Sequence, residues 1–490
     1  MKFKLSFIGL IALILVVWSN LFALEDDLYI SGMNQSEFVY KSTEDSLKSY
    51  FEEEFKFDLS YGDFRFGMEF EGYFPRYNKF NPIYELNSDD IQSRWRSRFV
   101  EYQTDNFLAR GGTFDAVFGS GLVLHAYDNK LMYEDNRLEG LYTKIDFKNS
   151  HIKALYSTAV SQNYSDKHDI VSGININFNL LSNLTLGSSF LSERYYVDGP
   201  EYEYNERNVL SGDINLSNDI FGWKTEVAGS KKIHTVSGNN VEGHAVYSNL
   251  NLYLGKFTIT SAYKNYENFD DRFSEPPTVN YSEEPLAEVG DYSLVGRDEE
   301  GIMGKVRFIP NYNNEFVVNY SEGWSSDFDV RQSDLHTAYN RDFESFYLSL
   351  EFNHLEMIND NNQHWKKEVT PKASVDFLLG ENPVLLKAEY EIKETDIAGE
   401  QETRYTPMLQ AELGYNSYSL SLFASTRYKK DESIIDSSPR VGMELFAPIW
   451  SHTNVKFFLG EEKGGKVCRN GVCNYQSPFS GVRLTLTTRF

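Results

Sequence analysis

Strict alternation of apolar and polar residues is the feature that most constrains how this chain can fold. In residues 55–61 every second side chain is large and apolar, and the side chains between are polar or charged. Residues 64–70 alternate in the same way, and Gly62-Asp63 separates the two segments. Successive side chains of a β-strand point to opposite faces, so one face of this predicted hairpin meets an apolar medium and the other meets water.

Short turns and longer polar connections alternate along the chain. The expected short turns lie at Gly62-Asp63, Asp105-Asn106, Asn149-Ser150, Leu181-Ser182, Ser217-Asn218, Gly255-Lys256, Asn311–Asn313, Asp342-Phe343, Gly380–Asn382, Asn416-Ser417 and Trp450–His452. The longer stretches between them are 76–91, 128–137, 162–167, 196–206, 234–241, 267–298, 326–329, 359–366, 396–402, 430–436 and 464–478. This rhythm is typical of an antiparallel up-and-down transmembrane β-barrel, and counting from Leu28 predicts about 24 strands, within a range of about 22–26.

Other architectures fit the sequence less well. A propeller would repeat a motif every ~40–50 residues, and a soluble sandwich of this length would split into domains joined by linkers. The sequence contains neither feature. A mean hydropathy of -0.47 also excludes a bundle of membrane helices. A barrel strand turns only alternate residues to lipid, so its average hydropathy resembles that of a soluble protein. We therefore expect one all-β domain over residues 24–490.

The first residues predict export. Lys2 and Lys4 precede an apolar run over residues 5–17, and Ala23 stands just before an acidic segment. This order is typical of a secretory signal peptide, which we place at residues 1–23. The alternative is an uncleaved anchor helix, but the apolar run is shorter than the ~20 residues that cross a bilayer.

The last ten residues form an alternating strand that ends on an aromatic residue. Its apolar face carries Val482, Leu484, Leu486 and Phe490. This pattern resembles the terminal signal of bacterial outer-membrane proteins, which the barrel-assembly machinery reads. Thr488 departs from the pattern, because a larger apolar residue is usual there. The resemblance implies a location in the bacterial outer membrane, and we expect this strand to close the barrel against the strand near Leu28.

The two cysteines flank a tight-turn sequence. Cys468 and Cys473 enclose Arg469-Asn470-Gly471-Val472, and Asn-Gly is a strong signal for a two-residue hairpin. The cysteines then face each other with Cα atoms about 4.5 Å apart, which a disulfide just accepts and an oxidising compartment permits. We predict a structural disulfide rather than two free thiols. Without a second pair or a nearby histidine, the spacing makes a poor metal site, and we expect no metal and no cofactor.

Residues 107–127 are the most unusual stretch of the chain. Taken as one strand, they are about twice as long as a membrane crossing needs. Phe114, Ala116, Phe118, Leu122 and Leu124 would then face lipid, while the lumen would receive Asp115, Gly119, Gly121 and His125. Glycine inside a strand marks a bend or a close backbone approach. The stretch is either a surface against which an inward-folded loop packs and narrows the lumen, or a bulge that curves the strand.

Part of the same region resembles a known family. Its matching residues are Gly111-Gly112-Thr113-Phe114, Phe118-Gly119-Ser120-Gly121-Leu122, Asp135-Asn136 and Gly140, with Tyr29-Ile30-Ser31-Gly32, Tyr50-Phe51 and Phe64-Arg65-Phe66-Gly67 nearer the N-terminus. They resemble the signature of an outer-membrane β-barrel family of unknown function, found mainly in Bacteroidota-type bacteria. Thr113 and Ser120 depart from that signature, which tends to have an asparagine and a large polar or basic residue at these positions. The resemblance implies a location and an architecture but brings no activity.

Charge and motifs narrow the function. A net charge of -25 argues against nucleic acid as a partner. No G-x-S-x-G or H-E-x-x-H motif occurs, so we do not expect an enzyme, and an outer-membrane hydrolase is the least favoured hypothesis. The first hypothesis is a porin-like passive channel for small solutes with a polar, partly obstructed lumen. The alternative is a non-conducting surface scaffold that partners a lipoprotein or a secretion apparatus. Outer-membrane lipid, lipopolysaccharide and the barrel-assembly machinery are the other expected partners.

Overall fold

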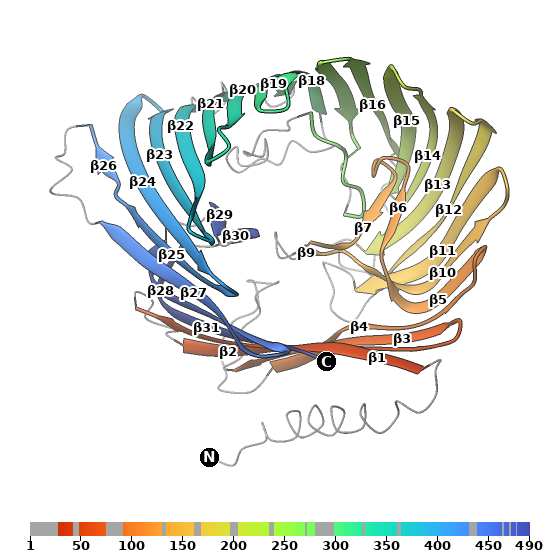
Figure 1. The fold of residues 1–490 in the computed structure, drawn as a ribbon. Coiled ribbons are helices and arrows are strands. Elements are labelled where there is room, and N and C mark those ends of the chain that lie inside the picture. The colour runs from red at the N-terminus through yellow and green to blue at the C-terminus, as the bar shows by residue number, and fades with distance from the viewer. Residues whose placement is uncertain are drawn as a thin grey trace.

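The computed structural model shows a closed antiparallel β-barrel (Figure 1). It describes residues 28–42, 49–74, 92–129, 134–160, 168–196, 204–234, 240–269, 272–279, 298–325, 329–359, 364–430, 439–462, 465–469, 472–476 and 478–490. The predicted signal peptide, residues 1–23, lies outside these ranges. Within them, no helix has the length and apolar character needed to cross a membrane.

The wall consists of strands that each pair with their neighbours along the chain. Its first half contains β1 (Leu28–Lys41), β2 (Ser49–Tyr61), β3 (Phe64–Phe74), β4 (Gln92–Gln103), β5 (Phe107–Phe114), β10 (Leu138–Asp146), β11 (Ser150–Val160), β12 (His168–Leu181), β13 (Leu184–Tyr196), β14 (Tyr204–Ser217), β15 (Phe221–His234) and β16 (Asn240–Leu254). Its second half contains β17 (Phe257–Glu267), β18 (Asp298–Asn311), β19 (Asn314–Ser325), β20 (Val330–Asp342), β21 (Phe346–Asn359), β22 (His364–Leu379), β23 (Asn382–Ile397), β24 (Glu400–Tyr415), β25 (Tyr418–Ser425), β26 (Tyr428–Lys429), β27 (Arg440–Trp450), β28 (Thr453–Glu462) and β31 (Phe479–Arg489).

The number of strands around the ring agrees with the sequence. Both β25 and β26 pair with β24, so they are two parts of one strand and the barrel has 24 strands. The interruption lies beside Pro407, whose carbonyl accepts a hydrogen bond from the Thr426 amide at 3.2 Å. Proline has no amide hydrogen to donate to a ladder, which explains why regular pairing stops there.

The short turns lie where the sequence predicted them, but one predicted longer connection is itself a tight turn. All eleven expected short turns join consecutive wall strands, with boundaries shifted by no more than about two residues. The stretch 396–402 was expected to be a longer connection, but Ala398-Gly399 alone joins β23 to β24. Both residues have positive φ, 54° and 88°, as a tight two-residue hairpin turn requires. The Gly399 amide also donates to the Asp396 carboxylate at 2.9 Å, which stabilises the turn.

The ring closes where the first wall strand meets the last. β1 pairs antiparallel with β31, which confirms the expected seam. Gly32 and Phe490 exchange two backbone hydrogen bonds of 2.8 and 3.1 Å. The Phe490 ring lies over Gly32, since a Cβ on that glycine would come within 2.3 Å of the ring. The same ring stacks on the Phe55 ring of β2, and the two ring centroids lie 6.2 Å apart. That the barrel-assembly machinery recognises β31 stays a prediction.

A side chain at position 32 should weaken the seam. We expect Gly32→Val to lower the free energy of unfolding by about 1–3 kcal/mol, because the Phe490 ring must leave its place. Gly304→Val is the matched control, since a Cβ there meets nothing within 4 Å. Urea unfolding in detergent micelles and the temperature at which the folded band disappears on a gel measure the effect. Equal stability of the two variants would contradict this view of the seam.

The outer surface carries a continuous apolar belt. Exposed aromatic residues lie at or beside the short turns: Tyr61, Phe64, Phe107, Phe257, Phe346, Tyr415, Tyr418 and Trp450. Exposed aliphatic and aromatic side chains continue above them, among them Phe190, Leu210, Val227, Val318, Leu350, Leu409 and Leu484. Outward charged residues, such as Arg194 and Lys231, then border the belt on the side of the longer connections. We call this border the charged collar. Soluble proteins rarely expose so large an apolar surface, whereas a lipid-facing barrel requires it.

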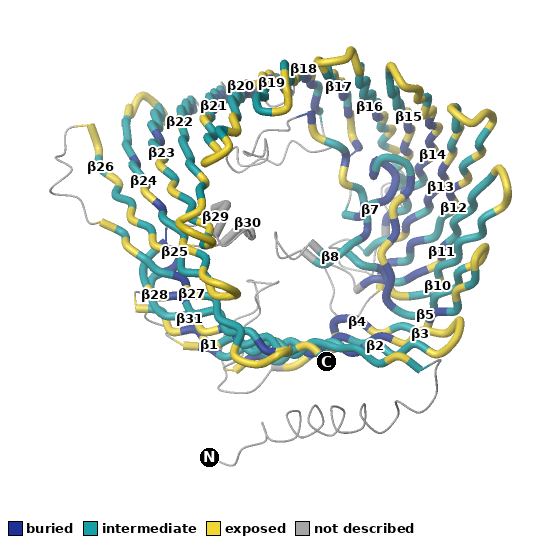
Figure 2. The backbone as a smooth tube through the Cα atoms, viewed as in Figure 1, coloured by how far each residue is buried: buried dark blue, intermediate teal, exposed yellow. Residues whose placement is uncertain are grey.

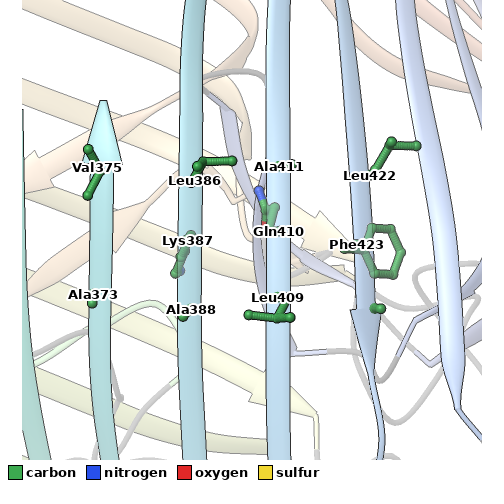
Figure 3. Close-up of a pocket in the computed structure, with 11 residues that line it drawn as sticks. Ala373, Val375, Leu386, Lys387, Ala388, Leu409, Gln410, Ala411, Leu422 and Phe423 are labelled. Carbon is green, nitrogen blue, oxygen red and sulfur yellow. The ribbon is translucent and has the colours of Figure 1, made fainter. Parts of the chain in front are cut away.

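A shallow depression of about 560 Å³ interrupts the belt across β22 to β25 (Figure 3). Small alanine side chains form it, and exposed leucines border it: Ala373, Ala388, Ala411 and Ala424, with Leu386, Leu409 and Leu422. Its lining is almost wholly apolar and offers no pairing of acid, base and nucleophile, so it is not a site for catalysis.

The cysteine hairpin has the expected backbone register. β29 (Gly465–Arg469) and β30 (Val472–Gln476) pair so that Cys468 lies opposite Cys473. The side chains of both cysteines lie outside the described part of the structure, so the disulfide itself stays a prediction.

Candidate functional site

Residues 115–129 and 134–137 leave the wall and fold into the lumen. This part of the chain, which we call the inner segment, contains the hairpin of β6 (Ala116–Phe118) and β7 (Leu124–Ala126) and the paired strands β8 (Asp128–Asn129) and β9 (Glu134–Asp135) (Figure 1). The expectation of one long strand over 107–127 is therefore wrong, because β5 ends at Phe114. Gly119 and Gly121 turn the chain back with φ of 63° and 98°, a conformation that glycine adopts most readily.

The inner segment packs against the wall through an apolar core. Phe114, Ala116, Phe118, Leu122 and Leu124 were expected to face lipid, and all five are instead at most 4% exposed. Their partners point inward from consecutive strands: Leu155, Val171, Leu191, Val209, Ala228 and Ala245. Figure 2 shows this burial along β6, β7 and the strands behind them. Alternation correctly grouped some of these side chains on one face, but it could not show that the segment itself lies inside the ring.

The tip of the first hairpin binds a buried carboxylate of the wall. Ser120 donates its amide and its hydroxyl to Glu226 Oε2, at 2.6 and 2.5 Å. Glu226 of β15 is 0% exposed. A Cβ on the adjacent Gly119 would come within 2.1 Å of the same carboxylate. Glycine at 119 is therefore a steric requirement of this contact as well as of the turn.

A second inward segment, residues 268–269 and 272–279 after β17, holds the first in place. His125 donates its amide to the Phe273 carbonyl at 2.7 Å, and the Glu275 amide donates to the Gly121 carbonyl at 3.1 Å. The His125 ring lies 2.6 Å from the Glu275 carboxylate and stacks on Tyr127. Phe273 joins the apolar core. The two segments thus form one layer on the inner face of β11 to β17.

A buried charge cluster fixes the second hairpin. The Arg96 guanidinium of β4 contacts Glu69 at 3.3 Å, Glu71 at 3.1 Å, Asp135 at 3.4 Å, and Asp128. Arg137 contacts Asp135 at 2.7 Å and Glu69 at 3.4 Å, and it donates to the Arg96 carbonyl. The Arg96 side chain is 2% exposed. We call these six residues the ion cluster. It connects β3 and β4 to the inner segment from the side opposite to the apolar core.

Arg96 and Arg137 favour the ionised form of Asp135 in the ion cluster. Burial alone would raise the pKa of Asp135, but the hydrogen bonds and charge of Arg137 and the charge of Arg96 outweigh burial and hold that pKa below its usual range. The same carboxylates raise the pKa of Arg137. Asp135 is therefore ionised, and Arg137 protonated, throughout the physiological pH range.

Comparison with known proteins identifies a family. The family of unknown function DUF6029 matches residues 4–286, more than half of the sequence. The chain belongs to this family. No curated protein matches the sequence.

Solved structures share the fold at low sequence identity. A chain of the E. coli P pilus tip assembly intermediate PapC-PapD-PapK-PapG matches with a TM-score of 0.57 and 10% identity, over 94% of this chain and 60% of that chain. The siderophore receptor PirA from Pseudomonas aeruginosa matches with a TM-score of 0.49 and 11% identity, over 95% and 80% of the two chains. OpdO from Pseudomonas aeruginosa matches with a TM-score of 0.41 and 12% identity, over 71% of this chain and 96% of that chain. The first of these matches, with a TM-score above 0.5, shows that the chain has a similar barrel fold, and at this identity the likeness concerns the fold alone.

The four predicted lumen residues all lie in the inner segment. Asp115 is exposed, Gly119 and Gly121 shape the tip, and His125 contacts the second inward segment. They build the obstruction rather than surround one ligand. Among the described residues, no group of three His, Cys, Asp or Glu side chains could hold a metal ion. Sequence reasoning missed the ion cluster, although Glu69 and Glu71 alternate on one strand and Arg94 and Arg96 on the next.

Removing the central cation should release the inner segment. In Arg96→Met four carboxylates lose a buried partner, and we expect a loss of about 3–5 kcal/mol in unfolding free energy. Arg65→Met, which breaks an exposed pair with Asp58, should cost about 1 kcal/mol or less. Urea unfolding gives the energies, and limited proteolysis reports cleavage within 115–137. If both variants lose the same stability, the cluster does not hold the segment.

Acid should weaken the contacts of Asp135 with Arg137 and Arg96. Because the folded-state pKa of Asp135 is lowered, its contribution is complete above the unfolded value of about 4 and is lost as the pH falls through the lower folded value. We expect hydrogen-exchange protection of 115–137 to persist from pH 7 to about 4 and to fall below that. Asp135→Asn should reduce both the protection at pH 7 and the change on acidification. If neither acid nor Asp135→Asn changes the hydrogen-exchange protection of this segment, Asp135 does not hold it.

Proposed function

We propose that this protein is an outer-membrane channel of the porin-like, passive kind, with a lumen that its own inner segment partly obstructs. The apolar belt, with its aromatic border at the short turns, supports the location in the bacterial outer membrane. Small polar solutes are the proposed substrates. Contacts with lipopolysaccharide and the barrel-assembly machinery, and an origin in Bacteroidota-type bacteria, remain proposals as well.

The width of the ring makes an obstruction necessary. The 24 strands, spaced about 4.8 Å apart and tilted by about 40°, give a ring about 45–50 Å across between backbones. Barrels of about 16–18 strands already enclose an aqueous channel. The observation that carries the proposal is the apolar core under the inner segment, because it packs that segment against one side of the lumen.

The opposite inner wall is polar and suits water. Lysine and glutamate side chains alternate across the inner face of β22, β23, β27 and β28, with pairs at 3.2 Å for Lys366–Glu368, 3.6 Å for Lys387–Glu389 and 3.3 Å for Lys456–Glu444. Such a surface is polar and carries both signs of charge on the side of the lumen that the inner segment leaves uncovered. We therefore place the solute path along this wall.

Removing the inner segment tests the proposal directly. Phe114 and Leu138 pair with each other, so an Asn-Gly turn can replace residues 115–137 and leave the β5–β10 hairpin intact. In planar bilayers we expect discrete openings from the natural protein and a conductance roughly two-fold larger or more from the variant, because the open cross-section grows.

Folding and the alternative function are checked in the same experiment. Heat-modifiable mobility on a gel confirms that each protein is folded, and Ser120→Ala, which keeps the segment, should leave conductance unchanged. Silence from both folded proteins would overturn the channel and favour the non-conducting scaffold.

A further inference from the structure

Three cations stand in one row on the inner face of the barrel. Lys393 of β23 lies opposite Arg404 of β24, and Arg404 lies opposite Lys429 of β26. Strand residues two apart share a face, so Lys393 points into the lumen with Lys387 and Glu389, and the residues opposite it do the same. Neighbouring strands are about 4.8 Å apart, and the three positions therefore span about 10 Å. We call these three residues the cation row.

Two carboxylates of the wall only partly balance the cation row. Glu368 lies 3.9 Å from Lys393 and also contacts Lys366 at 3.2 Å. Glu402 contacts the other two members of the row. Within 4 Å, and among the residues that the structure describes, two carboxylates are thus shared by four cations. Like charges that lie directly opposite each other destabilise a sheet, so this arrangement costs stability that a bound anion would restore.

Another inward pair of opposed lysines shows a different use of the charge. Lys144 of β10 lies opposite Lys153 of β11. Lys144 pairs with Asp146 at 2.8 Å, and Lys153 donates to the Val117 carbonyl of the inner segment at 3.1 Å. Each of these two lysines has an acceptor in the protein at hydrogen-bond distance, and one of them helps to hold the inner segment. The opposed lysines at β10 and β11 are therefore structural, and the cation row calls for another explanation.

The cation row is accessible and lies near one mouth of the barrel. The side chains of Lys393, Arg404 and Lys429 are 36%, 42% and 53% exposed. Lys393 is eleven residues from Asn382, the first residue of β23 after the short turn, and a membrane crossing takes about 9–11 residues. The row therefore lies toward the end of the barrel that carries the longer connections. Its strands stand across the lumen from β6 and β7 (Figure 1).

We propose that the cation row binds an anionic solute, one that carries two phosphate or carboxylate groups, at the mouth of the lumen. Oxygen atoms of such groups accept charge-assisted hydrogen bonds from ammonium and guanidinium groups. The chain has a net charge of -25, so it attracts an anion only where cations locally outnumber carboxylates. The inference rests on the proposed function, since it takes the lumen to be a solute path, and it names the class of solute.

Calorimetric titration of the full protein in detergent tests the cation row without requiring conductance. Pyrophosphate and succinate are the probes, at an ionic strength of about 50 mM to limit screening. We expect binding, and we expect Lys393→Gln/Arg404→Gln to raise the Kd about ten-fold or more, because charge-assisted hydrogen bonds are lost. Glu368 and Glu402 each keep one cation in this variant, so the wall should still fold. Tighter binding of pyrophosphate would assign the row to phosphate groups, and tighter binding of succinate to carboxylates.

The matched control is Arg65→Gln/Arg307→Gln. Both arginines face the lumen and are similarly exposed, at 45% and 47%, but each pairs with a carboxylate of its own, Asp58 or Glu315. This control removes the same charge and should change the Kd by less than about two-fold. An equal loss of affinity in both variants would show a general attraction of counter-ions and would overturn the proposal. Absence of binding by either probe to the folded natural protein would overturn it as well.

Bilayer conductance of the natural protein, with and without the probe, separates this proposal from the proposed function. Binding without any conductance would keep the cation row as an anion site and reject the channel. Conductance without binding would keep the channel and reject the anion site. Heat-modifiable mobility on a gel confirms that each protein is folded in both measurements.

Discussion

Closure of the backbone ladder between β1 and β31 is the interaction on which the rest of this structure depends. In a membrane an unpaired strand edge leaves amide and carbonyl groups without partners, and each costs several kcal/mol. The ring removes that cost only if its first and last strands meet in register. Gly32 makes this possible, because its missing side chain leaves room for the terminal Phe490 ring. A small residue on one strand and the last residue of another thus help to hold this ladder closed, together with the pairing of residues 33–41 with residues 481–489.

A closed ring of this size encloses an interior that either protein or water must fill. In this structure the chain fills one side of the interior and leaves the other side open. The inner face from β11 to β17 is apolar enough to bury the inner segment, and the face around β22 to β28 carries paired charges. The lumen is therefore asymmetric, with a dry side built like the core of a soluble domain and a wet side built like a protein surface. The asymmetry follows from which inward positions carry leucine and valine and which carry lysine and glutamate.

The sequence predicted the ring well and the interior poorly, for a physical reason. Strand positions such as 55–61 and 64–70 repeat a period that only one arrangement satisfies, so turns, strand number and seam could all be predicted. Residues 114–124 also alternate, but alternation tells only that side chains share a face. Whether that face meets lipid or the barrel's own wall depends on where the segment lies, which is a contact between parts of the chain distant in sequence. The ion cluster escaped for the same reason, since Glu69, Arg96 and Asp135 come from three separate segments.

Under the proposed location in the outer membrane, the tight turn at Ala398-Gly399 has a consequence for what lies outside the lipid. β23 and β24 run for 16 residues each and end in two residues rather than in a mobile loop, and a membrane crossing needs only about 9–11. With the short turns on the periplasmic side, as in outer-membrane barrels generally, the surplus stands beyond the lipid as a rigid, narrow hairpin. A rigid epitope loses little conformational entropy when it is bound. A protein that binds this hairpin would therefore meet a preformed target.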